Sequence, residues 1–276
     1  MNAKIIYGTA WKKEGTTALV VSAVLAGFRA IDTACQPKHY REDLVGEALQ
    51  VLYEKHGYKR EDLFIQTKFT SISGQDTSRP LPYDPSSTIE AQVRSSFATS
   101  LRQLRTTYLD SYILHSPLET YAKTLEAWRV LVCFQDEARV RVIGMSNTYD
   151  QTLLARLGED SGRAVQVVQN RWYEQNSWDR EVVGWCRANG AQYQSFWTLT
   201  GSPSLLSHPA TTAIATANNC SPPQAVYRFV QSLGITPLCG TTNEAHMRED
   251  LAAEKLDKGE GNFRTLTQFI WGDVEE

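Results

Sequence analysis

The sequence predicts an α/β fold in which eight parallel strands alternate with eight helices in a closed (β/α)8 barrel, the TIM barrel. Three observations lead to this expectation. Short apolar runs alternate along the chain with longer stretches of helical periodicity. The chain has 276 residues, of which 42% are hydrophobic, so it can bury one large core. No GxGxxG sequence follows the first strand, where an open dinucleotide-binding sheet would carry one. We therefore expect residues 1–276 to form a single domain.

The expected strands are short runs rich in apolar and β-branched residues. They cover residues 5–7, 30–32, 63–67, 111–114, 142–145, 165–168, 192–196 and 236–238. The expected helices lie between them, at residues 16–26, 41–55, 87–105, 121–137, 151–158, 179–188, 222–233 and 244–254. Four of these helices are followed by a glycine, at positions 27, 57, 190 and 234, as expected where a helix ends with a positive φ.

Two connections are longer than a barrel needs. Residues 69–86 follow the third strand, and residues 198–207 follow the seventh. Loops of this length in a compact domain are usually lids or binding loops, and a solvated surface excursion is the alternative. Both follow the carboxyl end of a strand, which is the face where (β/α)8 barrels carry their chemistry.

The composition argues against several classes of protein. The formal net charge is −3 and the charges are mixed along the chain, so nucleic acids and anionic membranes are not expected partners. No apolar run approaches the roughly 18 residues of a membrane span, and the amino terminus lacks a basic segment followed by an apolar one. Five cysteines without a CxxC pair predict reduced thiols. We expect a cytoplasmic protein that binds a small molecule and no metal. The sequence leaves the oligomeric state open.

Ionisable residues stand at the carboxyl ends of three expected strands. Asp32, Lys68 and His115 each end a β-rich run, and Tyr40 follows the first of them. In a (β/α)8 barrel these ends meet at one face. Singly, each residue has an ordinary alternative, since an Asp after a strand usually caps a turn and a single motif match is weak. Together they indicate a site that reduces a carbonyl group.

The order and approximate spacing of several motifs resemble the aldo-keto reductase family. These motifs are Gly8-Thr9-Ala10-Trp11, residues 27–34, Tyr40 with Val45-Gly46-Glu47-Ala48-Leu49, Lys68, Leu114-His115, Ile143-Gly144-Met145-Ser146-Asn147 and Gln169-Asn170. The resemblance extends over residues 5–251. It implies an oxidoreductase that uses NAD(P)H to reduce an aldehyde or ketone to an alcohol, on a (β/α)8 barrel and without a metal.

The resemblance also implies a role for each residue of the catalytic set. Tyr40 would give a proton to the carbonyl oxygen as hydride arrives at the carbon. Lys68 would favour the phenolate and so lower the pKa of that phenol. Asp32 would hold Lys68 and balance its charge. His115 would orient the carbonyl oxygen or relay a proton.

The chain departs from the family just before Tyr40. Seven residues, 33–39, separate Tyr40 from Asp32, where the family usually has four. Residues 45–49 follow Tyr40 at the family's distance, so the insertion precedes it and Tyr40 remains the candidate. Three side chains of this insertion could reach the mouth of the site: Cys35, Lys38 and His39. We expect them instead to be solvated loop residues.

Cofactor contacts follow from the same resemblance. Ser146, Asn147 and Gln169 stand where the family holds the nicotinamide carboxamide. Phe196, or its neighbour Trp197, stands where an aromatic ring stacks on the nicotinamide. The other expected contacts to NADPH are Thr9, Ala10, Asp32, Leu199, Gly201, Gly240, Thr241, Thr242, Asn243, His246 and Asp250.

The residues expected at the binding site for the 2′-phosphate of NADPH differ from the family pattern. NADPH-preferring members carry a Lys-Ser pair and, five residues on, an Arg, where this chain has residues 240–243 and His246. Hydroxyls and helix N–H groups still bind a phosphate, and Arg248 is a substitute cation if it points inward. Charge-assisted contacts are nevertheless weaker. We expect NADP(H) binding with a reduced preference over NAD(H), or use of both.

The expected walls of the substrate pocket are Trp11, Phe69, Ser116 and Trp172, with Tyr83 in the long loop beside them. Trp271 is a further candidate without a defined place. Ser116 stands where many relatives carry a large aromatic residue, which predicts an open pocket.

Two other functions are alternatives to the reductase. A non-catalytic nicotinamide-binding regulatory subunit would keep the barrel, but it would be free to lose the four catalytic residues, all of which are present. A metal-dependent hydrolase would need clustered His and carboxylate ligands, and the five histidines show no ligand-like pair. The reductase is the favoured prediction.

Overall fold

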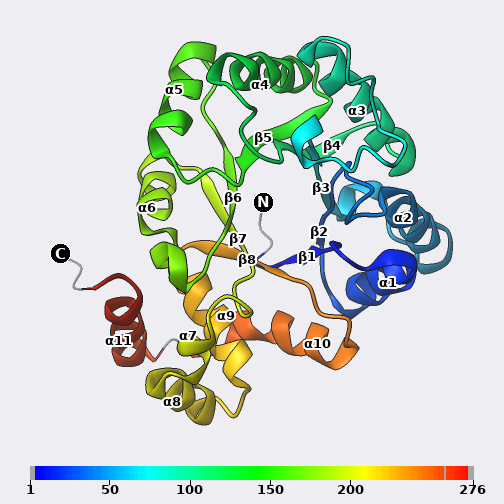
Figure 1. Cartoon of the computed structure of the whole chain (residues 1–276). Coiled ribbons are helices and arrows are strands. Elements are labelled where there is room, and N and C mark those ends of the chain that lie inside the picture. The colour runs from blue at the N-terminus through cyan, green and yellow to red at the C-terminus, as the bar shows by residue number, and fades with distance from the viewer. Residues whose placement is uncertain (1–3, 258, 273–276) are drawn as a thin grey trace.

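Eight strands pair in chain order into a closed parallel barrel. The computed structural model describes residues 4–257 and 259–272. Figure 1 shows the strands at the centre and the helices arranged around them. The predicted (β/α)8 barrel is confirmed. Residues 1–3, 258 and 273–276 of the predicted domain lie outside the described residues.

The strands are almost entirely buried, because helices cover the barrel outside and side chains fill it inside. They are β1 (Ile6–Gly8), β2 (Ala30–Asp32), β3 (Phe64–Phe69), β4 (Leu109–Leu114), β5 (Val140–Ser146), β6 (Val167–Arg171), β7 (Gln192–Phe196) and β8 (Ile235–Cys239). Each overlaps a predicted run. Successive side chains of a strand face opposite sides of the sheet, so Gln66 and Lys68 of β3 share a side and Phe69 takes the other.

Eight helices match the predicted ones. They are α1 (Thr16–Ala26), α2 (Glu42–His56), α3 (Ile89–Gln103), α4 (Tyr121–Asp136), α5 (Gln151–Ser161), α6 (Arg180–Asn189), α9 (Pro222–Ser232) and α10 (Glu244–Ala252). Side-chain caps explain some of their starts, since Thr88 caps α3 and Thr120 caps α4 by accepting a backbone N–H. Gly57 and Gly190 end α2 and α6 in the left-handed conformation.

Three further α-helices of the described residues were not predicted. They are α7 (Pro203–Ser207), α8 (Pro209–Ala217) and α11 (Glu260–Trp271). Helix α7 lies in the predicted loop 198–207. A proline occupies the first turn of α7 and of α8, where a missing N–H costs nothing. Helix α11 buries Phe263, Leu266 and Ile270. In Figure 1 it lies at the rim, beside α7 and α8.

The loop after β3, residues 69–86, packs on the insertion that precedes Tyr40. Gln36 donates to the carbonyl of Gly74 at 2.6 Å, and Gln75 donates to the carbonyl of Cys35 at 2.9 Å. The hydroxyl of Tyr83 donates to the carbonyl of Thr70 at 2.8 Å. These bonds fasten the loop to the insertion, although many residues of the loop itself are exposed.

Three structural observations bear on the class of protein. None of the described helices combines the length and the apolar character needed to cross a membrane. The five cysteines, all within the described residues, are free thiols. No three His, Cys, Asp or Glu side chains of the described residues gather as ligands for a metal ion.

A glycine sets the distance between α2 and α3. Gly46 lies inside α2, and a Cβ added there would overlap the carbonyl of Gln103, the last residue of α3. The backbone on both sides of this contact is helical, so it cannot retreat cheaply. Gly184 lies inside α6 in open space, with no atom within 4 Å of an added Cβ.

We therefore predict opposite effects for two Gly→Ala substitutions. Gly46→Ala should lower the free energy of unfolding by about 1–3 kcal/mol through overpacking. Gly184→Ala should leave it unchanged or raise it by up to about 1 kcal/mol, because alanine favours a helix over glycine. Urea denaturation of both variants measures this. Equal stability of the two variants would mean that α2 and α3 do not depend on the contact at Gly46.

Candidate active site

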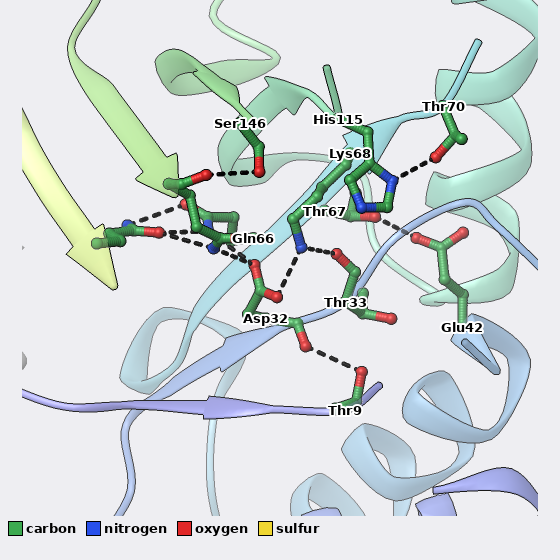
Figure 2. Close-up of polar contacts among 12 residues, drawn as sticks. Thr9, Asp32, Thr33, Glu42, Gln66, Thr67, Lys68, Thr70, His115 and Ser146 are labelled. Atoms are coloured by element: carbon green, nitrogen blue, oxygen red, sulfur yellow. Dashed lines mark hydrogen bonds and ion pairs between the residues drawn. The ribbon is translucent and has the colours of Figure 1, made fainter. Parts of the chain in front are cut away.

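A buried ion pair lies at the carboxyl ends of β2 and β3. Lys68 Nζ lies 2.6 Å from Asp32 Oδ2 and also donates to the carbonyl of Thr33 at 2.9 Å (Figure 2). The side chains are 1% and 3% exposed. Two charges so far from water remain stable only when both are paired and hydrogen-bonded. The structure thus brings these two predicted catalytic residues into direct contact.

Amide side chains from β3 and β6 hold the other oxygen of Asp32. Its Oδ1 accepts from Gln66 at 2.7 Å and from Gln169 at 3.0 Å. Both amides also donate to Gln194 Oε1, at 2.7 and 3.0 Å. Sequence reasoning missed Gln66 and Gln194. The signal was available, because a glutamine in an otherwise apolar strand needs polar partners inside the barrel.

Tyr40 lies above this pair. Lys68 Nζ is 5.3 Å from the centroid of the Tyr40 ring, and the Tyr40 and His115 rings meet edge to face with centroids 5.9 Å apart. Burial, and then the charge of Asp32, raise the pKa of the Tyr40 phenol above its ordinary value. The net shift is upward, because burial and the nearby carboxylate both disfavour the phenolate. That the Lys68 ammonium lowers this pKa relative to burial alone stays a prediction.

His115 is a neutral imidazole at the cavity wall. Burial, and then the Lys68 ammonium, lower the pKa of His115 well below its ordinary value. Its Nδ1 lies 2.7 Å from the hydroxyl of Thr70, which follows β3. One ring nitrogen is therefore occupied by Thr70. Burial also lowers the pKa of Lys68, against the opposing effect of Asp32.

These groups border a cavity of about 580 Å³ at the mouth of the barrel. The predicted residues in its lining are Ala10, Trp11, Asp32, Tyr40, His115, Ser146, Asn147, Gln169, Phe196, Trp197 and Gly240. Lys68 lies beneath, behind Asp32. Seven lining residues were not assigned to the site from the sequence: Gly8, Lys12, His39, Arg171, Thr200, Leu238 and Cys239.

A second cavity of about 480 Å³ continues toward α10. The predicted cofactor residues in its lining are Trp197, Leu199, Gly240, Thr241, His246 and Asp250. Trp197, Thr200, Leu238, Cys239 and Gly240 border both cavities. The two cavities therefore form one groove from the barrel mouth to the start of α10.

Several predicted contacts lie elsewhere. Phe69 and Trp172 are 1% and 0% exposed, so they are core residues and not pocket walls. Each follows an inward-facing residue of its strand and therefore points to the helix layer, where Phe69 contacts Tyr83 and Trp172 contacts Trp178. Ser116 is absent from the cavity lining.

Four predicted cofactor residues lie outside both cavities, and three of them have structural partners instead. Thr9 is fully buried, and its hydroxyl donates to the carbonyl of Asp32 at 2.9 Å. Gly201 packs against Tyr173, and a side chain there would clash. Asn243 caps α10, accepting from Ala245 N–H at 2.8 Å. Thr242 is exposed and belongs to neither cavity.

The end of the groove near α10 carries carboxyl groups. Glu249 and Asp250 line it together with His246. Asp250 accepts from the Cys239 thiol at 2.8 Å, and burial raises the pKa of Asp250 to about 6. Arg248 is not in the lining; it is exposed and lies 4.0 Å from Glu244. The suggested substitute cation thus faces away from the groove.

The insertion before Tyr40 shapes the wall of the cavity beside Trp11. The His39 and Trp11 rings stack with centroids 3.8 Å apart, and Trp11 N–H donates to the carbonyl of His39 at 2.8 Å. The expectation that His39 is a solvated loop residue is wrong, because the inserted segment turns it against Trp11. Cys35 is 2% exposed and also not solvated, whereas Lys38 is exposed as expected.

Several known proteins are similar to this chain in sequence or in fold. The sequence model of the Aldo/keto reductase family matches residues 4–270. The uncharacterized oxidoreductase YtbE of Bacillus subtilis is 30% identical over 234 residues, which cover 84% of this chain and 75% of YtbE. The methylglyoxal reductase DkgA of Salmonella typhimurium is 26% identical over 264 residues, which cover 94% of this chain and 87% of DkgA. The crystal structure of a Bombyx mori aldo-keto reductase in complex with NADP superposes with a TM-score of 0.79 at 21% identity, covering 96% of this chain and 88% of that one.

The family match and the architecture agree. The matched residues include all eight strands of the barrel and the buried Asp32–Lys68 pair. The curated relatives named here are oxidoreductases that align over most of their own length. The chain therefore belongs to the aldo/keto reductase family and is an oxidoreductase.

Proposed function

We propose that this protein reduces an aldehyde or ketone to an alcohol with NADPH or NADH, and that Tyr40 donates the proton. The observation that carries the proposal is the position of Tyr40 and His115 on the cavity wall, directly beside the buried Lys68–Asp32 pair. The relative named methylglyoxal reductase and the relative crystallised with NADP support a carbonyl substrate and a nicotinamide cofactor.

The groove suits an elongated dinucleotide. Asn147 Oδ1 and Gln169 Oε1 have no hydrogen-bond donor among the described residues, and both side chains line the cavity. These oxygens, with the hydroxyl of Ser146, would hold the nicotinamide carboxamide. Phe196 and Trp197 supply aromatic faces beside them. When bound, the cofactor supplies the hydride.

The proton step rests on the raised pKa of Tyr40. The phenol keeps its proton at neutral pH, so it is an intact acid when the substrate arrives. As hydride reaches the carbonyl carbon, the oxygen gains negative charge and becomes basic enough to take that proton. The phenolate that remains lies beside the Lys68 ammonium, which stabilises it.

Thr70 positions His115 for this step. If the Thr70 hydroxyl donates to Nδ1, the neutral ring carries its proton on Nε2 and can donate it to the carbonyl oxygen. A neutral donor orients the oxygen without competing with Tyr40 as the acid. Thr70 is therefore a positioning residue in this mechanism.

The end of the groove near α10 favours the use of both NADPH and NADH. Its lining contains His246 and two carboxyl groups but no Lys or Arg. A 2′-phosphate there would lack the charge-assisted hydrogen bonds that favour it elsewhere. We therefore propose that NADH is used as well as NADPH.

We predict that Tyr40→Phe lowers kcat/KM for carbonyl reduction by at least about 100-fold, because the proton donor is lost while the ring remains over Lys68. The dissociation constant for NADPH should stay within about twofold of the native value. Steady-state kinetics with methylglyoxal and a fluorescence titration measure the two. Undiminished reduction would remove Tyr40 from the mechanism.

We predict that Thr70→Val lowers kcat/KM by about 10-fold, because valine cannot fix the His115 tautomer and orientation. Thr70→Ser retains the hydroxyl and should recover most of the activity. Thermal denaturation of both variants serves as the control for folding. If Val and Ser variants lose activity equally, the hydroxyl has no part in positioning His115.

We predict that NADPH affinity falls more steeply than NADH affinity as pH rises from 5.5 to about 8. Through about pH 6 Asp250 gains negative charge, because burial raises its pKa to about 6. A carboxylate at this place repels the 2′-phosphate of NADPH, which NADH lacks. Titration with each cofactor across this range, following tryptophan fluorescence, measures the two slopes. Parallel slopes would place the 2′-phosphate away from Asp250.

A further inference from the structure

The active-site cavity carries unbalanced positive charge. Its carboxylate, Asp32, is neutralised by Lys68 at 2.6 Å. The lining also holds Lys12 and Arg171, and neither forms an ion pair within the part of the chain that the structure describes. A concave wall with this charge raises the local concentration of anions.

The two cations lie in different parts of the groove. Lys12 donates to the carbonyl of Gly240, a residue that borders both cavities. It is thus placed at the junction that an elongated cofactor would cross. Arg171 borders the cavity of Tyr40 and His115 but not the cavity near α10. We therefore expect the binding partner of Arg171 at the end of the groove that holds Tyr40 and His115.

Aromatic rings hold the guanidinium of Arg171 in place. Its central carbon is 4.4 Å from the Trp197 ring centroid and 5.8 Å from those of Tyr173 and Phe196. No described carboxylate or carbonyl accepts a hydrogen bond from this guanidinium. A guanidinium stacked on a ring keeps its N–H edges free, in the planar fork that matches a carboxylate.

We propose that Arg171 binds a carboxylate on the substrate, so that the preferred substrates are aldehydes or ketones that also carry a carboxylate group. This inference rests on the proposed carbonyl reduction and adds a substrate class to it. Arg171 is the last residue of β6, two positions after Gln169, so a rigid strand presents it to the same cavity as the proton donor. The carboxylate and the reacting carbonyl would contact different walls of one cavity.

The test compares matched acids and esters as substrates. The native protein is assayed with NADPH and 4-carboxybenzaldehyde or its methyl ester, and with succinic semialdehyde or its methyl ester. Arg171→Met should lower kcat/KM for at least one acid by about 10- to 100-fold, as expected for loss of a charge-assisted hydrogen bond, and change its ester less than about threefold. Arg171→Lys should lie between, because the ammonium keeps the charge but not the fork.

A matched control is Arg156→Met. Arg156 also stacks on an aromatic ring, with its guanidinium carbon 3.8 Å from the Tyr121 centroid, but it lies on the exposed face of α5. Arg156→Met should leave kcat/KM for the acids and for the esters unchanged. The dissociation constant for NADPH is measured for every variant, because a rise for Arg171→Met alone would indicate a contact to the cofactor.

The outcomes separate the two proposals. Native protein that reduces the esters but neither acid overturns the role of Arg171 and leaves carbonyl reduction intact. An equal loss for acids and esters in Arg171→Met, or a loss explained by NADPH binding, also overturns it. Native protein that binds NADPH but reduces none of the four compounds contradicts the proposed function itself.

Discussion

The buried Lys68–Asp32 pair is the interaction on which the rest of the site depends. Removing one member of such a pair typically costs about 3–5 kcal/mol, because the other charge is left unpaired in the interior. The barrel avoids that cost by surrounding Asp32 with amide donors from β3 and β6 and by giving Lys68 the carbonyl of Thr33. Gln194 joins these amides from β7. Gln66 lies on the strand next to Asp32, whereas Gln169 reaches Asp32 from β6, so the full set of contacts forms only when the barrel is closed.

This arrangement favours the proposed role of Tyr40 as an acid. A lone ammonium beneath the ring would favour loss of the phenol proton. Here Lys68 is paired with Asp32, and burial, followed by the charge of Asp32, raises the pKa of Tyr40. In the proposed mechanism the phenol therefore keeps its proton until a substrate oxygen becomes basic. His115, kept neutral by burial and by the same ammonium, adds a hydrogen-bonding group without adding charge.

The walls around this centre come from segments that do not belong to the regular barrel. The insertion before Tyr40 places His39 on Trp11, and the loop after β3 is fastened to that insertion through Gln36 and Gln75. On the other side, Arg171 lies against Trp197 at 4.4 Å. Trp11, His39, Arg171 and Trp197 thus border one cavity of about 580 Å³. In the proposals above, substrate choice depends on these walls, while the reaction depends on the barrel residues beneath them.

The sequence by itself determined the alternation of strands and helices and the polar ends of the strands. Periodicity is local, so β2, β3 and β4 and the residues Asp32 and Lys68 could be predicted from a few neighbouring positions. The helices α7, α8 and α11 were missed because prolines that start a helix read as loop residues and because weak local patterns depend on packing partners. Only the tertiary structure decided the rest. Closure of the barrel joins Gln66 to Gln194, 128 positions apart, and strand alternation turns Phe69 and Trp172 into the core. The same closure brings Arg171 to the cavity of Tyr40, because residues distant in sequence become neighbours only when the two edges of the sheet meet.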